Sequence, residues 1–334
     1  MKKSGCVIIA LFLAVCASMF INLLLFAALF GVRGTAKAAA VRALREKEFE
    51  EVLVKEGTVA GSKIAVIPLE GIIAHNQAGA LGDDMVQGFK NALEQARTDA
   101  QVKAVVISVD SPGGEITASD VLYNSLREFS KDKPSVIYFN SIGASGAYYA
   151  ACGASYIMCN ATTFTGSIGV IISTLNYRNL LGKIGLEAVI FKSGKFKDML
   201  NGAREMTPEE KAYVEGLVMQ SYDRFVGIVA KARNLDESAL RLGVADGRIL
   251  SGTDAFAAKL INQLGYVEDA FEKASELAHV PGARIVRYKR PISLGNLLRM
   301  FGETRSPSIK VDILEKIPHL EPGRVYLLPP FFAP

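Results

Sequence analysis

Hydrophobic and polar residues follow two alternating periods over the middle of the chain. Apolar runs typical of strands occupy residues 61–74, 102–110 and 135–140, and amphipathic stretches typical of helices separate them at 80–99 and 117–132. This alternation predicts βαβ units with right-handed crossovers. Because the strand-like runs are almost continuously apolar, we expect an α/β fold with a largely parallel sheet that is covered by helices on both faces.

Helical patterns predominate further along the chain. A long amphipathic helix is predicted over residues 207–234, where Thr207 and Glu210 form a capping-box pair at its start. A second helix is predicted over residues 251–265, since Gly265 is a natural residue to follow a helix end. No internal repeat divides the chain into two equal halves.

The amino-terminal pattern is of a third kind. Residues 6–32 contain no charged side chain, and the run exceeds the roughly 20 residues that cross a bilayer as a helix. A cleaved signal peptide is the alternative, because small residues follow at 36–40, but the apolar region of a signal peptide is only about 7 to 15 residues long. We therefore predict one uncleaved transmembrane helix.

Charges beside the apolar run leave its orientation open. Lys2 and Lys3 precede it and five basic residues follow it by residue 47, so the positive-inside rule alone favours a cytoplasmic body. Residues 36–55 are rich in helix formers and indicate a solvated juxtamembrane helix. The predicted segments are a cytoplasmic stub with the anchor (1–33), a helical stalk (34–62), a main domain (63–282) and a Pro-rich carboxyl-terminal extension (283–334).

Composition and charge narrow the class of protein further. The 334 residues are half hydrophobic, and the net charge of +4 is a small difference between 38 basic and 34 acidic residues. No basic run interleaved with aromatic residues is present, so we do not expect a nucleic-acid partner. The four cysteines lack the spacing of metal ligands, and no metal site is predicted. Whether Cys152 and Cys159 are bonded to each other stays open.

Two short motifs follow strand-like runs and could carry chemistry. Ser145 lies among glycines and alanines directly after residues 135–140, and Gly113 and Gly114 follow residues 102–110. Open α/β sheets place their sites at the carboxyl ends of strands. Ser145 fits either close helix packing or a nucleophile. A nucleophile would require N–H donors for an oxyanion, which Gly114 and Gly146 offer, and a base.

Residue types and their spacing do not show which residue would act as the general base. The chain has three histidines and none lies in a recognisable motif: His75, His279 and His319. Three lysines follow a strand-like run at 187–191, namely Lys192, Lys195 and Lys197. A lysine acts as a base when burial lowers the pKa of its amine by several units. The residues alone leave these three candidates equal.

Five motifs, taken in order, carry a family resemblance: "DSPGG", "GASGAYYAA", "TGSIGV", "SGKFKD" and "ADGRILSGTDAFAAKLINQLG". Together they resemble the signal peptide peptidase A family of membrane-bound Ser/Lys proteases, in its short, single-domain form. The resemblance covers about residues 63–282, which we therefore interpret as a Ser/Lys peptidase domain. It implies the fold of Clp protease and crotonase, and no cofactor.

The resemblance also implies roles for single residues. It makes Ser145 the nucleophile and Lys197 the general base, with Ser167 orienting the lysine amine. It places Gly114 in the oxyanion turn. The N–H of Gly146, directly after Ser145, would be the second oxyanion donor. Phe196, next to the lysine, stands where tyrosine is frequent in the family.

The same resemblance implies a substrate, an assembly and a location. Apolar extended peptides, chiefly remnant signal peptides in the membrane, would be cleaved by a homo-oligomeric ring in which neighbouring protomers share sites. The catalytic domain would lie outside the cytoplasm, against the charge count, on a single-pass protein of the cell membrane.

Three alternatives remain open at this point. They are a related membrane protease that acts on a membrane-protein partner, a crotonase-type acyl-CoA enzyme, and a catalytically silent membrane scaffold. The apolar tail at residues 325–334 could occupy the substrate groove, or it could simply pack on the body or be disordered.

Overall fold

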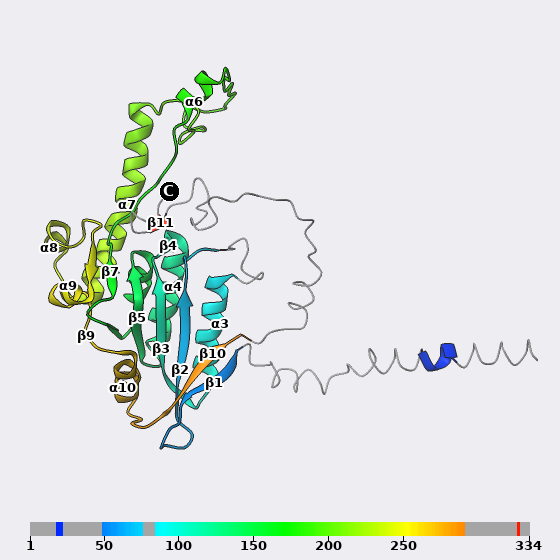
Figure 1. The fold of residues 1–334 in the computed structure, drawn as a ribbon, viewed down its shortest axis with the longest axis vertical. Coiled ribbons are helices and arrows are strands. Elements are labelled where there is room, and N and C mark those ends of the chain that lie inside the picture. Colours follow the sequence, from blue (N-terminus) through cyan, green and yellow to red (C-terminus); the bar gives the residue numbers. More distant parts are fainter. Residues whose placement is uncertain (1–17, 23–48, 76–83, 291–325, 328–334) are drawn as a thin grey trace, which may run out of the picture. The chain divides into compact units, whose positions relative to one another are not determined.

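The structure, a computed structural model, describes residues 18–22, 49–75, 84–290 and 326–327 (Figure 1). The chain divides into two units, residues 1–48 and residues 49–334. Of the first unit only residues 18–22 are described, and they are helical. The second unit, apart from residues 171–206, is called the body below.

A twisted, mostly parallel sheet forms the centre of the body. Its main path has the order β1-β10-β2-β3-β5-β6-β9, and β7 continues from β5 to β8. The pairs β1 with β10 and β7 with β8 are antiparallel, and the other pairs of this sheet are parallel. The strands of this sheet are β1 (Glu50–Lys55), β2 (Lys63–Glu70), β3 (Val102–Ser111), β5 (Ser135–Ala144), β6 (Tyr156–Cys159), β7 (Phe164–Gly166), β8 (Ile249–Ser251), β9 (Gln263–Leu264) and β10 (Arg284–Lys289).

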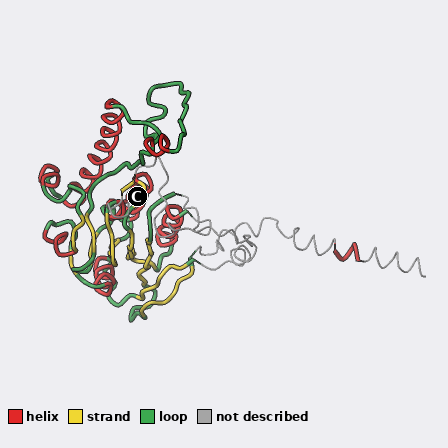
Figure 2. The backbone as a smooth tube through the Cα atoms, turned by 45° about the horizontal axis from the view of Figure 1, so that its top comes forward, coloured by secondary structure: helices red, strands yellow, loops and turns green. Residues whose placement is uncertain are grey.

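Helices cover both faces of this sheet, as Figures 1 and 2 show. Alternate residues of β2 enter two separate apolar clusters, Ala65 and Ile67 in one and Ile64 and Val66 in the other. The first cluster packs against α3 (Met85–Thr98), α4 (Ile116–Phe129), α5 (Gly146–Ala151) and part of α7 (Pro208–Arg233), whereas the second packs against α10 (Val267–Leu277). The predicted α/β class with a largely parallel sheet is therefore confirmed.

The helix starts agree with the local sequence signals. Asp84 caps α3 by accepting a hydrogen bond from the Val86 N–H at 2.9 Å. Thr207 and Glu210 form the predicted capping box of α7, which ends at Asn234 in the left-handed conformation. The shorter helices are α6 (Arg178–Lys183), α8 (Glu237–Leu242) and α9 (Gly252–Ala257).

Two boundaries of the predicted segments were wrong. The helix predicted over residues 36–55 does not include Glu50–Lys55, which form β1, and Arg284–Lys289 form β10 beyond the predicted end of the main domain. Both strands add to the edge of the sheet by pairing with each other, and β10 also pairs with β2. Pairing between segments so distant in sequence overrides local helix propensity.

Two predicted elements took another form. The predicted helix over residues 251–265 is shorter, because α9 ends at Ala257 and Gln263–Leu264 form β9 beside β6. Residues 187–191 form no strand, and Phe191 is 94% exposed. An apolar, β-branched run becomes a strand only where a partner strand and a surface to cover are present.

The predicted transmembrane segment lies almost wholly outside the described residues. Among the residues that are described, no helix is both long and apolar enough to cross a membrane. The stalk residues before Phe49 and nearly all of the extension after Arg290 also lie outside the described part.

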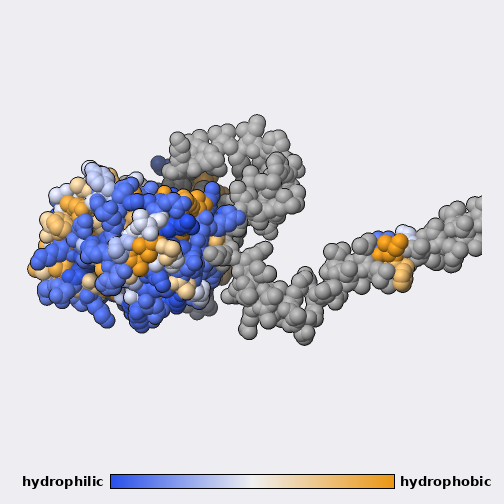
Figure 3. All heavy atoms as spheres, turned by 90° about the horizontal axis from the view of Figure 1, so that it is seen from below, coloured by the Kyte–Doolittle hydropathy of each residue, from blue (hydrophilic) through white to orange (hydrophobic). Residues whose placement is uncertain are grey.

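Residues 171–206 leave the body between β7 and α7 and are called the projecting segment below. Figures 1 and 2 show this segment, with α6 in it, extending past the end of the sheet beside the first turns of α7. Its exposed apolar side chains include Leu175, Tyr177, Leu180, Ile184, Leu186, Val189, Ile190 and Phe191. By contrast, the face of the body seen in Figure 3 is mostly hydrophilic, with small separate apolar areas.

Candidate active site

Ser145 lies at the point where β5 ends and α5 begins. Its backbone has φ 53° and ψ −115°, a conformation that non-glycine residues rarely adopt and that costs about 1–3 kcal/mol. Two backbone hydrogen bonds hold it there, from the Ser145 N–H to the Gly166 oxygen and from the Tyr149 N–H to the Ser145 oxygen, both 2.8 Å long. Strain of this kind persists only where the surroundings impose it, which is common at active sites.

The hydroxyl of Ser145 is the least satisfied polar group in this region. The residue is fully buried, and its Oγ has no hydrogen-bond partner within the described part of the chain. A buried hydroxyl without a partner costs about 1–3 kcal/mol. A serine that only filled space in a tight helix would be replaced by alanine at no such cost, so this geometry favours a functional hydroxyl.

Ser167 lies beside Ser145 because the strands that precede them are neighbours. In the parallel pair of β5 and β7, Ala144 is opposite Gly166, so the two serines follow directly from one register position. Neighbouring strands are about 4.8 Å apart. Ser167 is also buried, and it too has a positive φ, of 50°. The structure thus brings these two predicted site residues together.

The glycine turn at Gly113 and Gly114 reaches the same edge from the other side of β5. Ser111 at the end of β3 is opposite Gly143 of β5, and the turn follows immediately. Gly114 begins β4 (Gly114–Glu115) and forms a parallel bridge with Ile73. A Cβ atom on Gly114 would lie 1.9 Å from the backbone oxygen of Ile73, so only glycine fits this close approach.

Gly146 is the first residue of α5. The N–H groups in the first turn of a helix have no acceptor within that helix, and they point out of its amino-terminal end. With Gly114 on one side and α5 on the other, Ser145 lies between the two backbone segments that were predicted to supply oxyanion donors.

Lys197 is not brought to Ser145 within this chain. It lies in a turn of the projecting segment, where its N–H donates to the Gly194 oxygen at 3.0 Å and its side chain is exposed. Because Ser145 Oγ has no partner in the described part, the Lys197 amine is not hydrogen-bonded to it. The structure therefore assembles the serine half of the predicted dyad without the lysine half.

Another lysine has an altered pKa but the wrong location. Burial lowers the pKa of Lys133, whose Nζ donates to the backbone oxygens of Ala96 and Asp99 at the carboxyl end of α3. It precedes β5, whereas Ser145 follows β5. A strand of this length spans roughly 30 Å, so Lys133 cannot serve Ser145 as a base.

His75 is the histidine to compare with the lysines. The ring Nδ1 lies 3.3 Å from a carboxylate oxygen of Asp84. The backbone N–H of His75 donates to Glu115 Oε2, next to the glycine turn. No hydrogen bond joins it to Ser145, whose Oγ has no partner in the described part. His279 lies directly after α10, and His319 is outside the described residues.

The two cysteines in the described part of the chain do not offer a rival nucleophile. Cys152 and Cys159 are both free and buried. Burial raises the pKa of each thiol to about 12. Since the thiolate is the reactive form, both side chains are inert at neutral pH.

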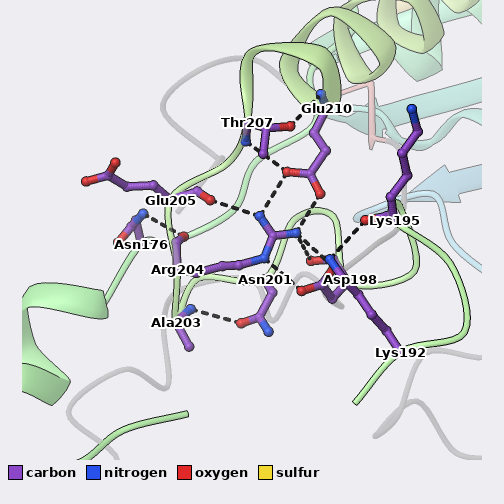
Figure 4. A network of polar contacts seen from close by, with 10 residues as sticks. All are labelled: Asn176, Lys192, Lys195, Asp198, Asn201, Ala203, Arg204, Glu205, Thr207 and Glu210. Carbon is purple, nitrogen blue, oxygen red and sulfur yellow. Dashed lines mark hydrogen bonds and ion pairs between the residues drawn. The ribbon is translucent and has the colours of Figure 1, made fainter. Parts of the chain in front are cut away.

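Several residues near the two halves were missed by sequence reasoning. In the projecting segment, Arg204 contacts Asp198 and Glu210 with multiple hydrogen bonds (Figure 4). The only available signal was that Asp198 directly follows Lys197 in the "SGKFKD" motif. Neither contact has the three- or four-residue spacing that would identify a local helical pair.

The carboxyl-terminal extension returns to the glycine turn. Residues Tyr326–Leu327 form β11, which pairs antiparallel with β4 so that Leu327 is opposite Gly114 and Tyr326 is opposite Glu115. A strand from the apolar tail therefore lies along the backbone segment that precedes α4, at the edge where Ser145 is found.

Comparison with known proteins gives consistent matches. The model of peptidase family S49 matches residues 127–281. A provisionally named signal peptide peptidase SppA of Enterococcus faecium is 37% identical over 246 residues, which cover 72% of this chain and 71% of that protein. A provisionally named protease of Methanocaldococcus jannaschii is 37% identical over 68% of this chain and 75% of its own length.

A more distant relative matches over a smaller share of its length. Protease 4 of Haemophilus influenzae is 30% identical over 75% of this chain and 40% of that protein. The residues matched by the family model include Ser145, Ser167 and Lys197, and the relatives confirm the family resemblance found in the sequence. The chain belongs to peptidase family S49, the signal peptide peptidase A family, and is a serine protease.

Proposed function

We propose that this chain is a membrane-anchored endopeptidase that uses Ser145 as nucleophile and Lys197 as general base. The observation that carries the proposal is the state of Ser145. It is held with a positive φ at a strand end, fully buried, with an unpartnered hydroxyl between the glycine turn and the start of α5.

The proposed reaction is acyl transfer in two steps. The neutral amine of Lys197 removes the Ser145 proton, and Oγ attacks the scissile carbonyl while the N–H groups of Gly114 and Gly146 bind the oxyanion. The lysine ammonium then protonates the leaving amine. Water attacks the acyl-enzyme with Lys197 again as base, which restores both side chains.

The lysine is proposed to come from a neighbouring protomer. Lysine acts as a base in a buried setting, because burial favours the neutral amine. The exposed Lys197 on a projecting segment fits a site that is completed only when a second copy covers it. Ser167, beside Ser145, would accept or donate one hydrogen bond that orients the incoming amine.

The exposed apolar side chains support this assembly. Several large ones lie on the same segment as Lys197, and Val189 and Phe191 are 71% and 94% exposed. Contiguous exposed apolar surface on a soluble body marks an interaction site. A closed homo-oligomeric ring, in which each projecting segment reaches the next body, would bury this surface and join the two halves of every site.

Apolar extended peptides are the proposed substrates, and remnant signal peptides in the membrane are the main class. An extended peptide can bind by adding a strand beside an active site. The antiparallel pairing of β11 with β4 supports this mode, since the tail already uses the edge next to Gly114 as a strand partner.

The membrane and fold assignments belong to the same proposal. The uncharged run at residues 6–32 would anchor the enzyme in the layer that holds such peptides, with the catalytic domain outside the cytoplasm. The parallel sheet with helices on both faces and strand ends converging on Ser145 supports a Clp protease/crotonase-like fold.

Fluorophosphonate labelling of the full-length protein tests the chemistry directly. We expect labelling of the wild type and none of Ser145→Ala, because the probe reacts with an activated serine. Lys197→Ala should label at least about 100-fold more slowly, since it keeps the nucleophile and loses the base. His75→Gln is the matched control and should label like the wild type.

The other outcomes distinguish the alternatives. Loss of labelling in His75→Gln with retention in Lys197→Ala would move the base to the histidine and overturn the dyad. Absence of labelling together with acyl-CoA turnover would indicate a crotonase-type enzyme. Full cellular function of Ser145→Ala would indicate a silent scaffold.

A further inference from the structure

The projecting segment carries Lys197 without an apolar core of its own. Among residues 171–206, only Gly202 is buried. It lies where the chain that leaves the body, at residues 174–177, meets the chain that returns to it. Tyr177 N–H donates to the Gly202 oxygen at 2.8 Å, and Thr174 Oγ1 donates to the Leu200 oxygen at 2.9 Å. Polar contacts and one ring contact, between Phe196 and Tyr213 of α7 at 5.3 Å between centroids, therefore determine where the lysine lies.

Arg204 makes the densest of these polar contacts (Figure 4). Its Nε and Nη2 donate to the two carboxylate oxygens of Asp198 at 2.7 and 2.8 Å. Its Nη1 donates to Glu210 Oε2 at 2.9 Å, and Nη2 donates to the other oxygen of Glu210. Each carboxylate thus meets two donors, a fork geometry that a guanidinium provides and an ammonium does not.

Glu210 connects this arginine to the body. It is only 3% exposed, and it closes the capping box of α7, with the Thr207 N–H donating to Oε2 at 2.9 Å. The hydrogen bonds from Arg204, followed by the one from the Thr207 backbone, lower the pKa of Glu210 to about 2. The side chain is therefore a fixed anion at the start of a helix whose later turns pack in the core.

Asp198 connects the same arginine to the proposed base. It is the residue after Lys197, so their Cα atoms are about 3.8 Å apart across one peptide bond. Its carboxylate is largely buried and also accepts a hydrogen bond from Lys192 Nζ at 2.6 Å. Hydrogen bonds from Arg204 and then from Lys192 hold the pKa of this carboxyl well below its usual range.

We propose that Arg204 is a positioning residue for Lys197, acting as a clamp between the lysine turn and the start of α7. The inference rests on the proposed role of Lys197 as base. A general base has to lie within about 2.6–3.2 Å of the atom that carries the proton it removes, and misplacement by about 1 Å can cost on the order of 100-fold in rate. Phe196, on the other side of Lys197, also contacts α7 through Tyr213, but Tyr213 is half exposed. Within the described part of this segment, Arg204 is the residue that joins a neighbour of Lys197 to the buried Glu210.

The test compares Arg204→Gln and Asp198→Asn with Arg178→Gln, in the assembled full-length protein. Arg178 is a matched control, because it lies on the same segment and pairs with the exposed Glu205 at 2.9 Å. We expect kcat for an apolar peptide, and the rate of fluorophosphonate labelling, to fall about 10- to 100-fold in the first two variants. KM should change by less than about threefold, and Arg178→Gln should match the wild type.

Three further readouts separate positioning from a merely structural role. Rates are expressed per site that can be labelled, so a loss of folded protein does not lower them. The acid limb of the kcat profile against pH should move in Arg204→Gln, and Arg204→Lys should remain impaired because an ammonium cannot meet both carboxylates. Guanidinium ion should restore part of the activity of Arg204→Ala and none of that of Lys197→Ala.

Each result decides the inference. An Arg204→Gln enzyme that keeps kcat within about twofold, beside an inactive Lys197→Ala, overturns the clamp and leaves the dyad standing. An active Lys197→Ala overturns the proposed base and the clamp together. If Arg204→Gln does not assemble, the near-isosteric Asp198→Asn decides on the same criterion.

Discussion

The carboxyl edge of the sheet and the projecting segment carry the two halves of the proposed site, and different forces hold them. Around Ser145, parallel strands and buried helices impose a strained backbone on a fully buried residue. Around Lys197, side chains are exposed or only partly buried, and an ionic clamp centred on Arg204 replaces the apolar core. The proposed nucleophile is thus placed by the folding of one chain, whereas the proposed base is placed by charges and, in our proposal, by assembly.

This difference separates stability from activity. Substitutions at the sheet edge should lower both, since the same contacts hold the fold and the serine. Substitutions on the projecting segment should lower activity or assembly while the body remains stable.

Removing either half should abolish the reaction, and mixing the two defects should restore part of it. Ser145→Ala and Lys197→Ala should each lower kcat by at least about 10³-fold. In rings assembled from equal amounts of both, about one site in four receives an intact serine and an intact lysine, so about a quarter of the activity should return. No recovery in oligomers verified to be mixed would place both residues within one protomer.

The glycine turn should tolerate no side chain. Gly114→Ala places a Cβ against the Ile73 backbone oxygen, so the turn must move, and loss of one oxyanion donor lowers kcat by about 10²- to 10³-fold. Gly216→Ala in α7 is the control, because a Cβ there meets no atom within 4 Å. Peptidase kinetics and thermal unfolding of both variants check this, and a fully active Gly114→Ala would remove the turn from the mechanism.

One apolar substitution inside the sheet and one on the projecting segment should have opposite effects on stability and assembly. Ile107→Ala in β3 should lower the free energy of unfolding by about 2–5 kcal/mol, since Ile107 is fully buried. Leu180→Asp on the projecting segment should change that free energy by less than about 0.5 kcal/mol and should dissociate the ring. Denaturant unfolding and native mass spectrometry make the comparison. An intact Leu180→Asp ring would place the interface elsewhere.

Deletion of residues 320–334 should increase the peptidase rate by a few-fold. The tail strand β11 pairs with β4, so its removal frees a strand edge that substrates could otherwise reach only by displacing it. The labelling rate of Ser145 should rise in parallel. Equal kinetics with and without the tail would show that this pairing does not limit access.

The carboxylates bound by Arg204 should stay ionised, and keep stabilising the fold, at a lower pH than ordinary carboxylates do. A carboxyl whose pKa is lower in the folded protein stabilises it above its unfolded pKa of about 4.3, and this contribution is lost as the pH falls toward the folded value. For Glu210 that value is about 2, so its contribution should be constant from pH 7 to about 5 and disappear between about pH 4 and 2. An NMR titration of the Glu210 carboxyl measures the pKa on which this prediction depends. An inflection near pH 4.3 would contradict the prediction.

Elements whose signals are local can be predicted from the amino-acid sequence alone. Continuous apolar runs gave the central strands, and Thr207 with Glu210 gave the start of α7. Small residues after strand ends also marked Ser145 and Gly114, because only such residues fit a strained corner or a close backbone approach. These properties are encoded within a few residues of chain, where propensity and sterics act directly.

Features that depend on pairing between distant segments became visible only in the folded chain. Glu50–Lys55 form a strand because β10 lies beside them. Residues 187–191 form none, because no strand of the described part pairs with them. The register of β5 with β7 put Ser167 beside Ser145, and the fold of the projecting segment put Arg204 between two carboxylates. Local pattern cannot encode these outcomes, since register, edge pairing and ionic contacts are determined by whichever segments the whole fold brings together.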